Sequence, residues 1–291
     1  LFKLNKMILK NKIKGGLRDK AIMKINTNAK PLISVITVVL NGEKYLEEAI
    51  LSVVKQTYDN VEYIIIDGGS TDKTIDIIRK YEHLIDYWIS EKDNGLYNAM
   101  NKGIALSRGE FIGFVGSDDY LHLDTLEKLA KVAKKQTIDF TVGPVNMIKK
   151  NGQLLEKALV LPNFLEKNRF IFNMATHHLS FYVNKKIINE VGIFDENFKI
   201  RSDYDMTISI MSISKKYYSF FDSVGAFREG GISGSYKSYF ETFYILRKHG
   251  VSIFRSILNI LPSLIKVFII KNFPSLIVSF LRKIFSSGRF I

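Results

Sequence analysis

The chain of 291 residues is 46% hydrophobic, which is enough for one large domain or for one domain with an appendage. It contains no cysteine, so disulfides, cysteine-ligated zinc and thiol catalysis are excluded. The net charge of +13 lies at the two ends: residues 1–30 and 242–291 each carry +8, and residues 31–241 carry −3. A nucleic-acid-binding domain would carry its positive charge on the folded core, so we expect no nucleic-acid partner. Basic ends suit anionic lipid headgroups instead.

The first 30 residues are basic and lack the apolar stretch of about 7–15 residues that is typical of a secretory signal. We therefore expect residues 1–30 to form a mobile basic arm. The composition then predicts a main domain over residues 31–241 and a basic, amphipathic helical segment over residues 242–291.

Strand and helix patterns alternate through the first half of the chain. Continuous apolar, β-branched runs predict buried strands, and apolar residues at helical spacing predict helices between them. In chain order we predict a strand at 33–39, a helix at 45–56, a strand at 61–66, a helix at 74–81, a strand at 86–90, a helix at 97–107 and a strand at 111–115. This alternation is typical of a parallel α/β sheet.

The pattern is less regular beyond residue 140. There we predict a strand at 140–145, a hairpin turn at 149–152, a strand at 180–183, and helices at 185–191 and 204–214. After residue 241, Pro262 and Pro274 are predicted to divide the chain into short helices. The charge-free runs there are well short of the roughly 20 apolar residues of a membrane span, so we expect an interfacial anchor; a cap on the core or a dimer contact is the alternative.

Carboxylates follow two of the predicted strands. Ligands of open parallel sheets bind beyond the carboxyl ends of the strands, and Asp67 and the pair Asp118 and Asp119 stand at such ends. Two adjacent acids repel each other unless a cation is bound, and hard oxygen ligands suit Mg²⁺ or Mn²⁺. Asp72 differs, because Ser70-Thr71-Asp72 predicts the cap of the next helix.

A set of motifs in order along the chain carries a family resemblance. The motifs are at residues 33–41, 49–53, 56–58, 67–72 (Asp-Gly-Gly-Ser-Thr-Asp), 91–103, 108–111 and 116–119 (Gly-Ser-Asp-Asp). Over residues 31–235 the chain resembles family 2 glycosyltransferases, most closely bacterial enzymes of the colanic acid and exopolysaccharide type. Each motif alone is weak, but the ordered set is specific.

The resemblance implies an α/β fold of the GT-A type, which has a Rossmann-like, nucleotide-binding mixed sheet flanked by helices, here with a C-terminal helical appendage. It implies inverting transfer from a UDP- or GDP-sugar, with Asp119 as ligand of Mn²⁺ or Mg²⁺. The matched nucleotide-sugar contacts are Asn41, Asp67, Gly69, Asp93, Asn94, Asn98 and Asp118. A plain helix cap is the alternative for Asp93 and Asn94. Two departures are Ser117, where the metal motif usually begins with an acid, and Gly68, where a second Asp is common.

Inversion requires a base that takes the proton of the acceptor hydroxyl. Residues 201–205 (Arg-Ser-Asp-Tyr-Asp) resemble the acidic segment of the family, and we predict Asp203 as the base. Asp205 is the alternative, although an acid at a helix N-terminus also has a structural use.

Three further features are assigned to the acceptor or phosphate side. His177 is one candidate; a metal site formed by both His177 and His178 is not expected, because adjacent residues of a strand point to opposite faces. Arg228 is a second candidate. Residues 230–235 resemble a lid over the diphosphate.

Charge and family resemblance together predict where the enzyme acts. We expect a cytoplasmic protein, peripheral at the inner face of the cell membrane, with a saccharide or lipid-linked saccharide acceptor in bacterial surface polysaccharide synthesis. The oligomeric state stays open. A nucleotidyltransferase acting on sugar phosphates would carry a Gly-rich, basic loop after the first strand, where this chain has Leu40-Asn41-Gly42-Glu43. A non-catalytic nucleotide-sugar-binding homologue is disfavoured by the presence of Asp67, Asp119 and Asp203.

Overall fold

The computed structural model describes residues 12–27, 30–156, 177–230 and 236–272. The chain divides into two compact units after Gly230. The sequence prediction placed this boundary after residue 241, which lies inside helix α8 (Tyr236–Lys248). Residues 231–235 of the expected lid and Pro274 are outside the described residues.

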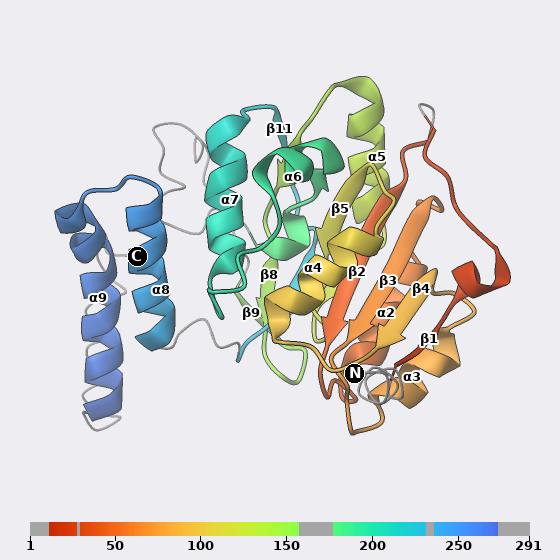
Figure 1. Cartoon of the computed structure of the whole chain (residues 1–291), viewed down its shortest axis with the longest axis horizontal. Helices are drawn as coiled ribbons and strands as arrows, with labels where there is room; N and C mark the ends of the chain where they lie inside the picture. Colours follow the sequence, from red (N-terminus) through yellow and green to blue (C-terminus); the bar gives the residue numbers. More distant parts are fainter. Residues whose placement is uncertain (1–11, 28–29, 157–176, 231–235, 273–291) are drawn as a thin grey trace, which may run out of the picture. The chain divides into compact units, whose positions relative to one another are not determined.

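An eight-stranded mixed sheet forms the centre of the first unit, in the order β1-β4-β3-β2-β5-β10-β7-β11 (Figure 1). The strands are β1 (Ile13–Gly15), β2 (Ile33–Val39), β3 (Val61–Asp67), β4 (Tyr87–Ser90), β5 (Phe111–Phe114), β7 (Phe140–Val142), β10 (Val183–Asn184) and β11 (Tyr217–Ser219). Strands β4, β3, β2 and β5 are mutually parallel, which confirms the predicted α/β sheet. Their carboxyl ends therefore meet at one edge.

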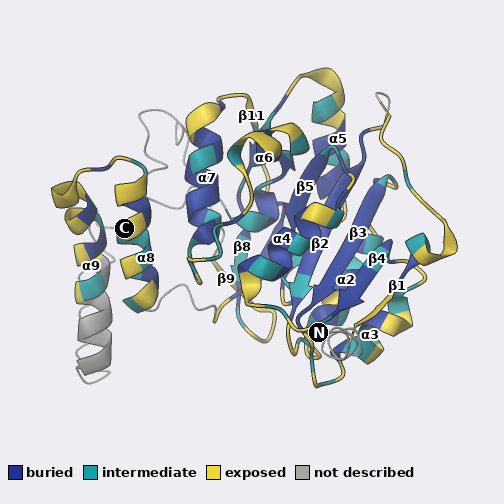
Figure 2. Ribbon diagram, in the orientation of Figure 1, coloured by how far each residue is buried: buried dark blue, intermediate teal, exposed yellow. Residues whose placement is uncertain are grey.

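Helices cover both faces of this sheet. On one face, Ile33 and Val35 of β2 share a core with three helices, which are α2 (Leu46–Val54), α3 (Thr74–Tyr81) and α5 (Thr125–Lys135). On the other face, Ile36 lies against Gly103 of α4 (Leu96–Leu106), where a Cβ would be only 2.5 Å from the isoleucine side chain. Because β2 and β3 are covered on both sides, they are buried almost throughout, as Figure 2 shows, and they read as continuous apolar runs.

A second sheet and several short elements complete the first unit. The sheet has the order β6-β12-β8-β9, and its strands are β6 (Tyr120–Leu121), β12 (Gly225–Arg228), β8 (Asn146–Ile148) and β9 (Leu154–Glu156). Strands β8 and β9 form the predicted hairpin. The other elements are the 3-10 helix η4 (His178–Ser180) and the helices α6 (Lys185–Val191) and α7 (Ser202–Ile213). Strand β6 directly follows Asp119 and pairs with β12, so this sheet fixes the loop that follows β5.

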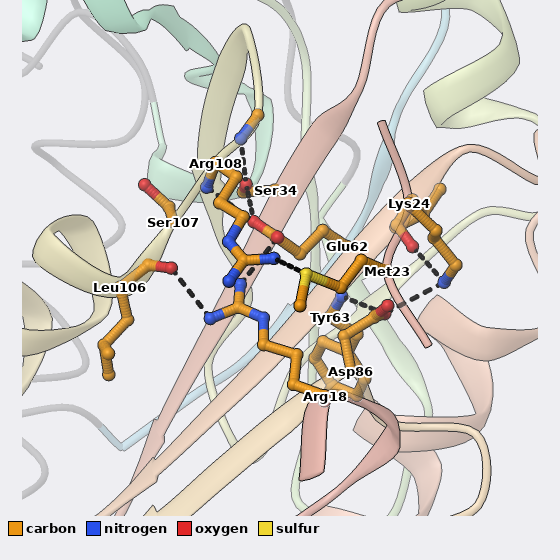
Figure 3. Close-up of polar contacts among 12 residues, drawn as sticks. Arg18, Met23, Lys24, Ser34, Glu62, Tyr63, Asp86, Leu106, Ser107 and Arg108 are labelled. Carbon is orange, nitrogen blue, oxygen red and sulfur yellow. Dashed lines mark hydrogen bonds and ion pairs between the residues drawn. The ribbon is translucent and has the colours of Figure 1, made fainter. Parts of the chain in front are cut away.

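The described residues 12–27 of the N-terminal segment do not form the mobile arm that the sequence predicts. Strand β1 pairs with β4 at the edge of the sheet. Arg18 forms an ion pair with Glu62 at 2.6 Å and donates a hydrogen bond to the carbonyl of Leu106 at 3.0 Å, and Lys24 pairs with Asp86 at 2.9 Å (Figure 3). Glu62 and Asp86 are both 2% exposed. Two cations of residues 12–27, Arg18 and Lys24, are therefore partners of buried acids, which the composition alone does not reveal.

The second unit contains α8 and α9 (Ile253–Asn272), which pack against each other. Helix α9 continues through Pro262, so the prediction that this proline ends a helix is wrong. A proline in a helix leaves one carbonyl without its N–H donor, here that of Leu258. Both residues are exposed, so this carbonyl is not enclosed in the core. No helix among the described residues is long and apolar enough to cross a membrane.

Candidate active site

Asp67 ends β3 and organises the loop that follows it. Its side chain is fully buried and accepts hydrogen bonds from the backbone N–H groups of Gly69 and Ser70, both at 3.0 Å, and from the hydroxyls of Ser70 and Ser90. Gly69 adopts a φ of 88°, which favours glycine. With both oxygens occupied, Asp67 holds the shape of the loop. Direct contact of Asp67 or Gly69 with a nucleotide stays a prediction.

Asn41 connects the loop after β2 to the loop after β3. Its φ is 53°, its backbone N–H donates to the hydroxyl of Ser70 at 2.7 Å, and its side-chain oxygen accepts from the N–H of Thr71 at 2.9 Å. Asp72 accepts from the N–H groups of Thr74 and Glu43, both at 3.0 Å, which agrees with its interpretation as a cap. These bonds fix the two loops at the carboxyl edge of the sheet.

Asp118 and Asp119 lie in the loop between β5 and β6, as the sequence predicts. Asp119 is 5% exposed; its Oδ1 accepts from the backbone N–H of Arg228 at 3.1 Å and its Oδ2 lies 3.1 Å from Nε2 of His178. A Cβ on Gly116 would lie 2.5 Å from that Oδ2, so glycine makes room for the carboxylate. Burial, followed by the charge of Asp119, raises the pKa of Asp118.

His178 is the site residue that the sequence analysis missed. The strand assumed there does not form; His177 caps the 3-10 helix η4, and the two imidazole rings lie 4.1 Å apart. One ligand atom from each of Asp119, His177 and His178 fits within 4.8 Å of the others, so the argument against a paired histidine site is wrong. The only usable signal in the sequence was the His-His pair itself, which needed the correct local structure.

The two histidines have different electrostatic surroundings. Burial lowers the pKa of His177 well below its usual value, and its ring stacks on Phe227 at 4.3 Å. Burial alone would also lower the pKa of His178, but the hydrogen bond and charge of Asp119 outweigh it and the pKa is raised. Asp203 and Asp118 act in the same direction.

Asp203 lies in the first turn of α7 and faces a small cavity. Its Oδ1 accepts from the hydroxyl of Tyr97 at 3.0 Å and from the N–H of Tyr204 at 2.9 Å, while burial raises its pKa. The cavity is lined mainly by apolar side chains, with His178 and Asp203 as its ionisable residues. Asp205, the alternative base, is 5% exposed and does not line this cavity.

The loop between β4 and α4 carries the remaining donor-side candidates. Oδ1 of Asp93 accepts from the N–H of Gly95 at 2.8 Å, and the exposed Asn94 donates its N–H to the side chain of Asn98 at 3.3 Å. Asn98 donates in turn to Glu196 at 3.1 Å. Asp93 and Asn94 thus have local structural contacts, and Asn98 connects α4 to the segment before α7.

Arg228 lies beside the site, but its side chain points toward α2. The guanidinium pairs with Glu48 and lies 4.3 Å from the ring centroid of Tyr45, and the residue is 8% exposed. Its contact with the site is made by the backbone N–H, which donates to Asp119. The predicted phosphate contact of the side chain stays a prediction.

Residues 34–198 match the family model described as "Glycosyl transferase family 2". The chain belongs to glycosyltransferase family 2. The family decides against the nucleotidyltransferase alternative, and the enzyme is a glycosyltransferase.

Relatives of this family 2 enzyme include the "Putative teichuronic acid biosynthesis glycosyltransferase TuaG" of Bacillus subtilis. It is 27% identical over 228 residues, which cover 76% of this chain and 90% of that protein. A "PGL/p-HBAD biosynthesis glycosyltransferase" of Mycobacterium tuberculosis is 28% identical over 63% of this chain and 71% of its own length. An "Uncharacterized glycosyltransferase" of Rickettsia typhi is 28% identical over 67% of this chain, which spans 63% of that protein's length.

Solved structures share the fold of this family 2 enzyme. S. aureus TarS in complex with UDP-GlcNAc has a TM-score of 0.62 at 20% identity, and the similarity covers 80% of this chain and 71% of that one. The mannosyltransferase PcManGT from Pyrobaculum calidifontis, in complex with GDP-Man and Mn²⁺, has a TM-score of 0.57 at 14% identity, covering 92% and 84%. The fold is GT-A, as the sequence resemblance implied.

Proposed function

We propose that this enzyme is an inverting, metal-dependent glycosyltransferase that moves a sugar from a UDP- or GDP-sugar to a saccharide acceptor in bacterial surface polysaccharide synthesis. The observation that carries the proposal is the group formed by Asp119, His178 and Asp203: His178 contacts Asp119, and the charge of Asp203 acts on it. A candidate metal ligand and a candidate base thus face one site. The sugar nucleotides bound to TarS and PcManGT support the donor class, and the name of TuaG supports the polysaccharide context.

A divalent cation fits the ligand atoms of Asp119, His177 and His178. One carboxylate with one or two imidazoles forms a mixed oxygen and nitrogen set, which favours Mn²⁺ over Mg²⁺, because Mg²⁺ prefers oxygen alone. His178 would supply a ligand that Ser117 does not. When bound, the metal stabilises the negative charge of the diphosphate leaving group.

We assign the role of the base to Asp203. Its Oδ1 is held by Tyr97 and Tyr204, and Oδ2 has no hydrogen-bond partner among the described residues. In a single displacement, the acceptor oxygen bonds to the anomeric carbon, the bond to the diphosphate oxygen breaks, and the proton passes to Oδ2 of Asp203. The attack comes from the face opposite the leaving group, so the configuration inverts.

Nucleotide release from a panel of UDP- and GDP-sugars, with Mn²⁺ and a saccharide acceptor, tests this function. Excess EDTA should abolish release; full activity in EDTA would contradict the metal dependence. Asp203→Asn should keep donor binding and lower turnover by about 10²–10⁴-fold, the usual contribution of a general base. Asp205→Asn should turn over near the wild-type rate. The reverse result would assign the base to Asp205.

We also propose that the second unit binds the inner face of the cell membrane and brings the enzyme to a lipid-linked acceptor. Residues 242–291 contain no acid. The exposed apolar residues of α9 fall within an arc of about 140° at 100° per residue. They are Ile253, Phe254, Ile257, Leu258, Leu261 and Ile265. Vesicles with anionic phosphatidylglycerol should carry the wild type in flotation and lose the variant with Phe254, Leu258 and Leu261 replaced by Ser; equal flotation would reject the anchor.

A further inference from the structure

The space beside Gly68 is occupied by another side chain. A Cβ on Gly68 would lie 2.5 Å from Oδ2 and 3.2 Å from Cγ of Asp93. The φ angle of Gly68 is not positive, in contrast to that of Gly69, so its backbone is open to other residues. A side chain at position 68 would therefore have to displace the carboxylate of Asp93, which lies 25 residues further along the chain.

Asp93 presents the available carboxylate oxygen at the end of β3. Both oxygens of Asp67 already accept hydrogen bonds from Gly69, Ser70 and Ser90. Asp93 uses Oδ1 for the N–H of Gly95, and among the described residues Oδ2 has no donor. An acceptor oxygen thus stands beside the strand end without a protein partner.

The position of Oδ2 of Asp93 relative to the candidate metal site indicates which part of the donor substrate it binds. Strand β2 lies between β3 and β5, so these two strands are two strand spacings, about 10 Å, apart across the sheet. A donor whose diphosphate lies near Asp119, which follows β5, would have its nucleoside at the end of β3 when it extends along this sheet edge. The groups of a nucleoside that a carboxylate accepts from are the N–H of the base and the hydroxyls of the ribose.

We infer that Asp93 binds the nucleoside of the donor. Its Oδ2 lies where a side chain at position 68 would otherwise be, and it accepts a hydrogen bond from the base or the ribose. The inference rests on the proposed function, and it narrows the nucleotide-sugar contact expected of Asp93 to the nucleoside. It also explains why the chain combines glycine at position 68 with an acid at position 93.

Titration calorimetry with UDP and GDP in the presence of Mn²⁺ tests the inference. Asp93→Asn keeps an oxygen for the N–H of Gly95 but removes the charge. It should bind the nucleotide that the wild type prefers about 10- to 100-fold more weakly, as expected for a lost hydrogen bond to a charged group. Melting temperatures near that of the wild type establish that the variant is folded.

A relocated carboxylate gives the sharper comparison. Gly68→Asp alone should weaken binding, because its side chain collides with Asp93. Gly68→Asp combined with Asp93→Gly should recover most of the affinity, whereas the matched control, Gly68→Ala with Asp93→Gly, should not. Binding by Asp93→Asn within twofold of the wild type, or equal affinity of the two double variants, would overturn the inference and leave the proposed function intact. A wild type that binds neither UDP nor GDP would overturn the proposed donor class itself.

Discussion

Replacing Arg18 by Met should unfold the N-terminal segment from the sheet and lower the stability of the whole first unit. Its side chain is 10% exposed and lies 2.6 Å from Glu62, whose side chain is 3% exposed. Among the described residues, no other cation pairs with Glu62. The substitution therefore leaves a carboxylate in the interior without its counter-charge.

The expected loss can be estimated from what remains around Glu62. Removal of one partner of a buried ion pair costs about 3–5 kcal/mol. Glu62 retains hydrogen bonds from the hydroxyl of Ser34 at 2.5 Å and from the N–H of Arg108 at 2.7 Å (Figure 3). These two donors partly stabilise the isolated charge, so we expect the lower end of that range, about 3 kcal/mol. Adding Glu62→Gln removes the charge and should restore most of the loss.

Urea unfolding followed by circular dichroism measures these free energies. The control is Lys14→Met, which breaks the exposed pair with Asp19 at 3.4 Å and should cost less than about 1 kcal/mol. If Arg18→Met loses no more stability than Lys14→Met, the segment contributes little to the fold and the reasoning is refuted. If the double variant is as unstable as the single one, the loss comes from packing of the arginine stem and not from the charge.

The active-site side chains give four more expected outcomes. Because burial raises the pKa of Asp203, and a base must be ionised, turnover should fall with decreasing pH through a pKa above the usual 3.8. Above that pKa the wild type holds a buried charge, so at about pH 8 Asp203→Asn should have a higher melting temperature than the wild type. The difference between the two melting temperatures should narrow as the pH falls. A difference that is constant with pH would contradict this. Asp67→Asn should cost about 2–3 kcal/mol in urea unfolding without ligand, since an amide N–H₂ then faces N–H and O–H donors; weaker nucleotide binding at unchanged stability would instead indicate direct contact. His178→Ala should raise the Mn²⁺ concentration for half-maximal turnover by about tenfold or more, and an unchanged midpoint would place the ligand elsewhere.

The central fold could be predicted because its strands are covered on both faces. Burial on both sides makes most residues of 33–39 and 61–67 apolar, and such runs are visible without knowledge of the rest of the structure. The exceptions are Ser34, Thr37, Glu62 and Asp67. Strand β1 has three residues, and it is stabilised by pairing with β4 more than 70 positions away. Its existence depends on that partner and on the pair of Arg18 with Glu62, and neither contact leaves a local pattern in the sequence.

The candidate site was predictable to the same limit, which is the end of each strand. Asp67 and Asp119 are at strand ends and were found there, but their neighbours come from distant segments. His178 meets Asp119 only because residues 178–180 form a 3-10 helix and not a strand, so an error in local structure became an error about the site.

The contact between Gly68 and Asp93 also joins distant segments of the chain. Considered separately in the sequence, Gly68 is a departure from the family pattern, and Asp93 is either a nucleotide-sugar contact or a helix cap. The structure connects the two residues, because the carboxylate of Asp93, in the loop after β4, occupies the place of a side chain at the end of β3. A departure from a family pattern at one position therefore need not be a loss of function. It is a reason to look for the residue that fills the same space, and the exchange of the carboxylate between positions 68 and 93 tests whether that residue also does the same work.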